Sequence, residues 1–142
     1  MHLAIDGFGG AAAKLQDQQL VYNILDELPD RIGMTKIMPP YVFKYNGIKP
    51  EDWGISGFVL IAESHISIHT FPEKGYVNVD VFSCKYFESQ AAIDYVTERF
   101  ELEGINVNVL DRGLEYPTDV ASAASIVRRE RSQVLSTVGA SG

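Results

Sequence analysis

Two runs of strictly alternating side chains constrain the fold of this chain more than any other feature. The runs cover residues 63–71 (ESHISIHTF) and 76–84 (YVNVDVFSC), and residues 72–75 (PEKG) separate them. Alternation of this kind is typical of β-strands whose two faces differ. Because the short break contains proline and glycine, it is typical of a chain reversal. The two runs therefore predict a β-hairpin with a PEKG connection.

The alternation also predicts how the polar side chains of this hairpin are distributed. His65 and His69 share one face of the first strand, whereas Ser64 points to the other face. In the second strand, Asp80 and Cys84 share a face. Two of the three histidines and the only cysteine of the chain therefore fall within one hairpin.

Other periodic segments predict helices that pack on a sheet. Apolar residues at helical spacing predict helices over residues 17–28, ended by Pro29, and 89–102. Further strands are predicted over residues 1–6, 35–45 and 105–110, and an apolar strand over residues 55–61 continues into the alternating run of residues 63–71. The order β-α-β-β-β-α-β predicts an α/β (α+β) fold, a two-layer sandwich with a mainly antiparallel β-sheet and helices packed on one face.

Two irregular places are expected within these strands. Pro39 and Pro40 make the strand over residues 35–45 an edge or irregular strand, because proline cannot donate to a central ladder. Near Glu63 and Ser64 the apolar run of residues 55–61 changes into alternation, which predicts a bend or break in the chain.

Composition limits the class of protein. The chain has 142 residues, of which 46% are hydrophobic and 22% charged, as expected for a soluble globular domain. A net charge of -7 argues against nucleic acid or an anionic membrane as the main partner. No apolar run reaches the roughly 18 residues of a membrane helix. A single cysteine forms no internal disulfide, so we expect a reducing cytoplasm.

The sequence predicts one domain over residues 1–116 and a tail over residues 117–142. Pro117 interrupts the preceding pattern. Residues 119–135 predict a third, amphipathic helix, and the small residues after it predict a disordered end.

Several kinds of chemistry are compatible with serine, histidine and cysteine on paired strands. A hydrolase site is one, but the chain has no G-x-S-x-G elbow around Ser64. His65 and His69 lie about 13 Å apart at the rise of a strand, which is too far for both to bind one zinc ion. Polar residues on the exposed face of a sheet remain the simplest alternative for each residue taken alone.

Taken together, the motifs resemble one family. ESH, IHTFPEKGY and VDVFSC are similar to the self-processing region of the prokaryotic S-adenosylmethionine decarboxylases. The resemblance extends upstream through GISGFVLIAESH and more weakly to HLAIDGFGG, so it covers most of residues 1–115.

This resemblance implies a proenzyme that cuts itself between Glu63 and Ser64. The hydroxyl of Ser64 attacks the Glu63 carbonyl to form an ester, and loss of the Ser64 α-proton then releases the Glu63 carboxylate. The dehydroalanine that is left hydrolyses to a covalent pyruvoyl group, with no metal involved. The products are a β chain, residues 1–63, and an α chain that begins at residue 64. A strained peptide bond at a strand end would favour such an attack.

The resemblance also implies roles for individual residues. Ser56 and His69 match residues that support self-cleavage, with His69 as the proton acceptor. Cys84 matches the acid that returns a proton to the substrate carbon, and the hairpin brings it back beside Ser64. The pyruvoyl group made from Ser64 forms a Schiff base with the substrate amine and accepts the electrons left by CO2.

The resemblance supports a functional role less strongly for four further residues. Glu73 matches an acidic residue of the family and Phe71 stands where a tryptophan is frequent, so both are candidate substrate contacts. For Glu73, a carboxylate that is solvated in the turn and contacts no substrate is an equal alternative. For Asp80 and His65, structural roles are the stronger interpretation.

The motif leaves the substrate open. Gly9 and Gly10 stand where the family frequently has a cysteine, and pyruvoyl-dependent arginine or ornithine decarboxylases share the processing apparatus. The favoured hypothesis is a lyase that supplies decarboxylated S-adenosylmethionine for spermidine, and hence polyamine, biosynthesis. A non-catalytic regulatory homologue is a weaker alternative. The family implies a homo-oligomer, with a dimer of αβ units expected.

Overall fold

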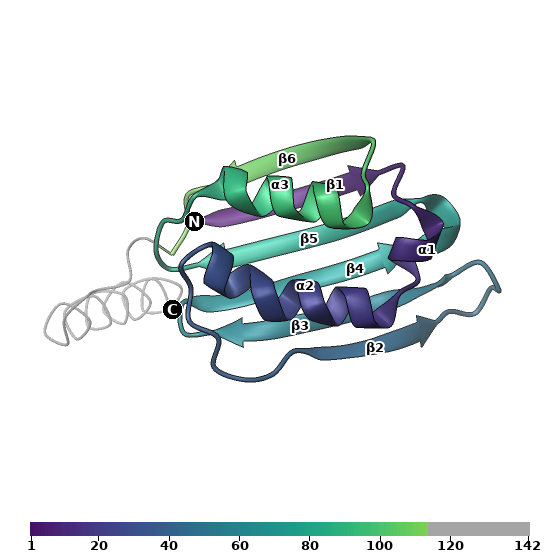
Figure 1. Ribbon diagram of the computed structural model, residues 1–142, viewed down its shortest axis with the longest axis horizontal. Coiled ribbons are helices and arrows are strands. Elements are labelled where there is room, and N and C mark those ends of the chain that lie inside the picture. Colours follow the sequence, from purple (N-terminus) through teal and green to yellow (C-terminus); the bar gives the residue numbers. More distant parts are fainter. Residues whose placement is uncertain (114–142) are drawn as a thin grey trace, which may run out of the picture.

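In the computed structural model, which describes residues 1–113, the chain forms one six-stranded sheet with helices on one face (Figure 1). The strands are β1 (His2–Phe8), β2 (Tyr41–Asn46), β3 (Trp53–Ile61), β4 (Ser64–Phe71), β5 (Tyr76–Ser83) and β6 (Gly104–Leu110). The helices are α1 (Ala12–Leu15), α2 (Gln18–Arg31) and α3 (Ser89–Phe100), and the 3-10 turn η1 (Pro72–Lys74) joins β4 to β5. The strand order is β2-β3-β4-β5-β1-β6, with every neighbouring pair antiparallel. The predicted two-layer sandwich is confirmed.

The hydrophobic core lies between the sheet and the helices α2 and α3, which cover the same face in Figure 1. Helix α2 begins where Asp17 accepts a hydrogen bond (3.0 Å) from the backbone N–H of Leu20. Its fully buried residues are Val21, Ile24, Leu25 and Leu28. In β5, every second residue from Val77 to Ser83 is buried under the helices. The opposite face of the sheet carries no helix of the described chain.

Helix α2 continues past the residue at which its end was predicted. Pro29 lies inside the helix, which ends at Arg31. Proline lacks an N–H, but in the last turn this removes only one intrahelical hydrogen bond. The carbonyl of Pro29 accepts hydrogen bonds from the backbone of Ile32 (3.2 Å) and Met34 (2.8 Å), so the turn is closed beyond it.

The predicted bend at Glu63 is in fact a complete reversal of the chain. Strands β3 and β4 are antiparallel neighbours, and the pair formed by Ile61 and Ser64 closes a tight turn at Ala62 and Glu63. Because Ile61 and Ser64 are paired, their side chains lie on the same face, so the buried residues shift from odd positions in β3 to even positions in β4. Periodicity alone does not distinguish this turn from a bend, and the middle of the chain holds four strands where the predicted order had three.

The predicted edge strand is confirmed, but it is shorter than residues 35–45. Strand β2 starts at Tyr41, directly after the two prolines, and forms one edge of the sheet. Residues before the prolines instead run beside the β3–β4 turn. The carbonyl of Thr35 accepts a hydrogen bond (2.8 Å) from Ala62, and Lys36 forms an isolated bridge with Ile61.

A glycine in β3 should be the most sensitive small residue of the sheet. A Cβ on Gly54 would overlap the backbone carbonyl oxygen of Thr70 in the neighbouring strand. We expect Gly54→Ala to lower the free energy of unfolding by about 2–3 kcal/mol, because the two backbones must separate. Gly104→Ala is the control, since a Cβ there meets nothing within 4 Å. Urea denaturation measures both, and equal effects would contradict this prediction.

No helix within residues 1–113 is long and apolar enough to span a membrane. The tail predicted over residues 117–142, including its amphipathic helix, lies outside the described residues.

Candidate active site

The β3–β4 turn holds its backbone in an unusual conformation at Ser64. This residue has a φ of 150°, a region that residues with a side chain rarely adopt. The only other described non-glycine residue with positive φ is Glu101, which ends helix α3. The strain therefore falls on the residue that follows the Glu63–Ser64 peptide bond.

Glu63 is held by contacts at both its backbone and its side chain. Its carbonyl oxygen accepts a hydrogen bond (2.9 Å) from the backbone N–H of Cys84. Its carboxylate accepts one (3.1 Å) from the N–H of Thr35 and lies 3.2 Å from the ammonium of Lys85. Burial by itself raises the pKa of the Glu63 carboxyl, but these two contacts outweigh burial and lower that pKa below its ordinary value. The carboxylate is therefore charged, and its position is defined.

The hairpin brings Cys84 back beside the turn. Ser83, the last residue of β5, pairs with Ser64, so Cys84 stands opposite Glu63. Its thiol is free and its side chain is exposed. Glu63, Ser64 and Cys84, which were singled out from the sequence, lie together at one end of the sheet.

Ser56 and His69 meet at a different place. They are directly opposite each other on β3 and β4, and a hydrogen bond of 3.0 Å joins Ser56 Oγ to His69 Nδ1. His69 stands five residues beyond Ser64 on the same strand, which corresponds to roughly 16 Å at the rise of a β-strand. Within one chain, the pair is therefore too far from Ser64 for proton transfer.

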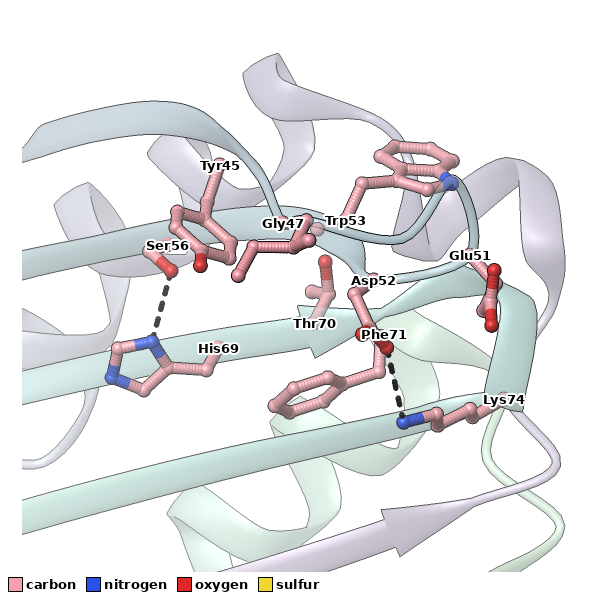
Figure 2. A pocket seen from close by; sticks show the side chains of 12 residues that line it. Tyr45, Gly47, Glu51, Asp52, Trp53, Ser56, His69, Thr70, Phe71 and Lys74 are labelled. Carbon is pink, nitrogen blue, oxygen red and sulfur yellow. Dashed lines mark hydrogen bonds and ion pairs between the residues drawn. The ribbon is translucent and has the colours of Figure 1, made fainter.

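The Ser56–His69 pair forms one wall of a cleft with a volume of about 430 Å³ (Figure 2). Figure 2 shows Phe71 beside His69, and Tyr45 and Trp53 on the opposite side. The complete lining comprises Tyr45, Gly47, Ile48, Glu51, Asp52, Trp53, Gly54, Ser56, His69, Thr70, Phe71 and Lys74. An aromatic cleft with a few polar groups can bind a small planar ligand.

Of the two candidate substrate contacts, only Phe71 lines this cleft. The carboxylate of Glu73 instead accepts a hydrogen bond (3.1 Å) from the indole N–H of Trp53, so it orients a residue of the cleft from outside. Tyr45 and Trp53 were not singled out as site residues. Their only signal in the sequence is that these two aromatic residues flank the polar, turn-forming segment of residues 46–52.

Two further polar residues of the hairpin have structural partners. Asp80 lies 2.8 Å from the ring of His2, and His65 packs edge-on against Phe82 at 5.7 Å between ring centres. Among residues 1–113, no three histidine, cysteine or acidic side chains gather in a way that would hold a metal ion.

Comparisons with known proteins identify the family. A family model described as S-adenosylmethionine decarboxylase matches residues 1–113. The S-adenosylmethionine decarboxylase proenzyme of Pyrococcus furiosus is 34% identical over 115 residues, which are 80% of this chain and 78% of that protein. The proenzyme of Archaeoglobus fulgidus is 35% identical over 113 residues, which are 79% of this chain and 96% of that protein.

A solved structure shows the same fold. The adenosylmethionine decarboxylase of Aquifex aeolicus matches with a TM-score of 0.66 and 31% sequence identity, over 83% of this chain and 94% of that one. The fold and these matches together define the class of protein as a decarboxylase proenzyme. Because the family model spans all of the described residues, the chain belongs to the S-adenosylmethionine decarboxylase family.

Proposed function

We propose that this chain cuts itself between Glu63 and Ser64 and becomes a pyruvoyl-dependent decarboxylase of S-adenosylmethionine. One observation carries the proposal. The Glu63–Ser64 peptide bond lies in a tight turn, and the backbone of Ser64 is strained. The carbonyl oxygen of Glu63 accepts a hydrogen bond from the N–H of Cys84. Strain raises the energy of the intact amide, and the N–H donor stabilises negative charge on the oxygen under attack.

The proposed cleavage proceeds in three steps. Ser64 Oγ bonds to the Glu63 carbonyl carbon, the C–N bond breaks, and the hydroxyl proton passes to the released amine. A base then removes the α-proton of Ser64, and the Cβ–Oγ bond breaks, so the Glu63 carboxylate leaves with the serine oxygen. The remaining dehydroalanine takes up one water and releases ammonia, which leaves the keto group.

His69 is the proposed base, but its distance from Ser64 requires a second copy of the chain. With roughly 16 Å between the two residues along β4, His69 of one chain would act on Ser64 of another. The helix-free face also favours association. Its exposed large side chains include Tyr41, Phe43, Phe58 and Leu60, which are 37–58% exposed. An apolar surface of this kind is typical of a protein interface. We therefore propose a dimer whose two sites each combine residues of both chains.

Mixing two inactive variants tests this arrangement. Alone, Ser64→Ala should stay uncut and His69→Ala should stall before or at the ester. Co-expressed with different tags, the two chains should form a dimer with one complete site, in which only the His69→Ala chain is cut. Denaturing gels with tag-specific detection measure the outcome.

Two results would contradict it. Rapid cutting of His69→Ala alone would show that another base serves. If the His69→Ala chain stayed whole in co-expressed dimers isolated through both tags, each site would draw on a single chain. Sedimentation of the same material measures the size of the assembly.

The cleft and Cys84 have complementary proposed roles in decarboxylation. The pyruvoyl group would form from Ser64, which is half-buried at the start of β4, and it would supply a carbonyl that binds the substrate amine and accepts electrons as CO2 leaves. The aromatic side chains of Tyr45, Trp53 and Phe71 suit a flat adenine ring and a sulfonium cation. The thiol of Cys84 then donates a proton to the substrate carbon.

A direct assay identifies the substrate. We expect CO2 release from carboxyl-labelled S-adenosylmethionine, with arginine and ornithine turned over at least about a hundredfold more slowly because neither has an adenine ring to fill the cleft. Turnover of arginine or ornithine instead would favour the rival amino-acid decarboxylase. A single uncut band on a denaturing gel, with no CO2 released, would favour a non-catalytic homologue. The proposed product supplies the aminopropyl donor for spermidine in the cytoplasm, where Cys84 stays reduced.

A further inference from the structure

Three consecutive residues at the end of β5 contact the β3–β4 turn. Ser83 pairs with Ser64 in the sheet, and the N–H of Cys84 donates to the carbonyl of Glu63. The third residue, Lys85, reaches the carboxylate of the same glutamate. The N–H of Cys84 takes part in the proposed cleavage by binding the carbonyl oxygen under attack, whereas Lys85 contacts Glu63 only at its side chain.

Lys85 is anchored at both ends. Its backbone N–H donates a hydrogen bond (3.0 Å) to the hydroxyl of Ser83, which is completely buried. Its ammonium lies 3.2 Å from Glu63 Oε1 and donates a second hydrogen bond (3.0 Å) to the carbonyl of Gly33. The ammonium therefore joins the loop after α2 to the turn that carries the peptide bond to be cut.

The contacts around Glu63 restrict how that residue can rotate. Lys85 and the N–H of Thr35 hold one oxygen each of its carboxylate, and Cys84 holds its carbonyl. The Glu63 side chain is only 12% exposed, whereas that of Lys85 is 51% exposed. An ion pair with one exposed partner contributes little to folding stability, so its main effect is on the orientation of Glu63.

We propose that Lys85 is a positioning residue for self-cleavage, which holds Glu63 so that its carbonyl carbon faces the hydroxyl of Ser64. The proposal rests on the proposed function, since it requires that the Glu63–Ser64 bond is the one cut. It adds that the ammonium acts through the Glu63 carboxylate and touches no reacting atom. Small errors in the approach of two reacting groups are costly, because the rate depends on their alignment.

The rate of self-cleavage tests this role in the full-length chain. Precursor made by cell-free translation with labelled methionine is chased, and its conversion is followed on denaturing gels. We expect Lys85→Met to slow cleavage about tenfold to a hundredfold. Lys85→Arg should retain most of the rate, since it keeps a cation at that position. Glu63→Gln should slow cleavage to a similar degree, and the double variant should be no slower than either single one, because the two side chains act as one unit.

Two controls separate positioning from folding. Lys36→Met removes another ion pair beside the same turn, with Asp26 of α2, and should leave the cleavage rate unchanged. In the uncuttable Ser64→Ala background, Lys85→Met should leave the melting temperature nearly unchanged.

The outcomes also separate this proposal from the one on which it rests. If the wild-type chain stays uncut, both proposals are overturned. If the wild type is cut and Lys85→Met is cut equally fast, only the role of Lys85 is overturned. Multiplied effects in the double variant, or a fall in melting temperature that accompanies the slower cleavage, would overturn it as well.

Discussion

We expect Ser64→Ala to yield one uncut chain of about 15.7 kDa that releases no CO2 from S-adenosylmethionine. Alanine has no hydroxyl to attack the Glu63 carbonyl, so the ester cannot form and no keto group can arise. Both cleavage and activity should therefore fall below detection together. A denaturing gel and mass spectrometry of the intact protein measure the first, and release of labelled CO2 measures the second.

Ser67→Ala is the matched control for this variant. Ser67 lies on the same strand, three residues further along, and its side chain is half-buried on the helix-free face. We expect this variant to be cut normally. Two fragments from Ser64→Ala, or an uncut but active wild-type chain, would remove the basis of the proposed function.

Replacing Cys84 by alanine should separate the two stages of the chemistry. The contact to the Glu63 carbonyl comes from the backbone N–H, which alanine keeps, so self-cleavage should proceed. Decarboxylation should slow by about 10²–10⁴-fold, because the thiol that returns the proton is gone. The measurement is kcat for CO2 release, on protein whose cleavage has been verified by mass spectrometry.

Cys84→Ser refines this experiment. A hydroxyl is a much weaker acid than a thiol, so serine should also be cut and should restore only a small part of the activity. Full turnover by Cys84→Ala would show that another group donates the proton. Failure of both variants to be cut would mean that the side chain, and not only the backbone, takes part in processing.

Much of the fold could be predicted from the sequence, because the patterns that indicate strands, helices and turns involve residues close together along the chain. The alternation in β4 and β5 follows from burial of one face, and the glycine that ends the connection between them has a φ of 60° at Gly75. The apolar stripe of α2 likewise predicted a helix, although its end at Arg31 depends on hydrogen bonds beyond Pro29.

Part of the candidate site could also be predicted, because it depends on the register in which β4 and β5 pair. Once β4 and β5 pair, Cys84 must stand opposite Glu63, because Ser64 faces Ser83. The motifs that resemble a known family lie on these strands, and the matching family model confirms that resemblance. The roles of Ser64, His69 and Cys84 stay proposals until the variants are measured.

Other features depend on contacts between distant segments. The reversal at Ala62 and Glu63 shifts the alternation of buried residues by one position, which a bend would also do, so only the pairing of β3 with β4 reveals it. The aromatic cleft forms because Tyr45, Trp53 and Phe71 come from three strands that meet at one end of the sheet.

The sequence by itself determined the strands, the helices and the chemical groups available, because periodicity and residue type are properties of neighbours along the chain. Only the tertiary structure decided where those groups stand. It placed Lys85 on the carboxylate of Glu63 and the N–H of Cys84 on its carbonyl, and it paired His69 with Ser56 on the neighbouring strand. Distances of this kind follow from strand pairing and turn geometry, which join residues that are remote in sequence.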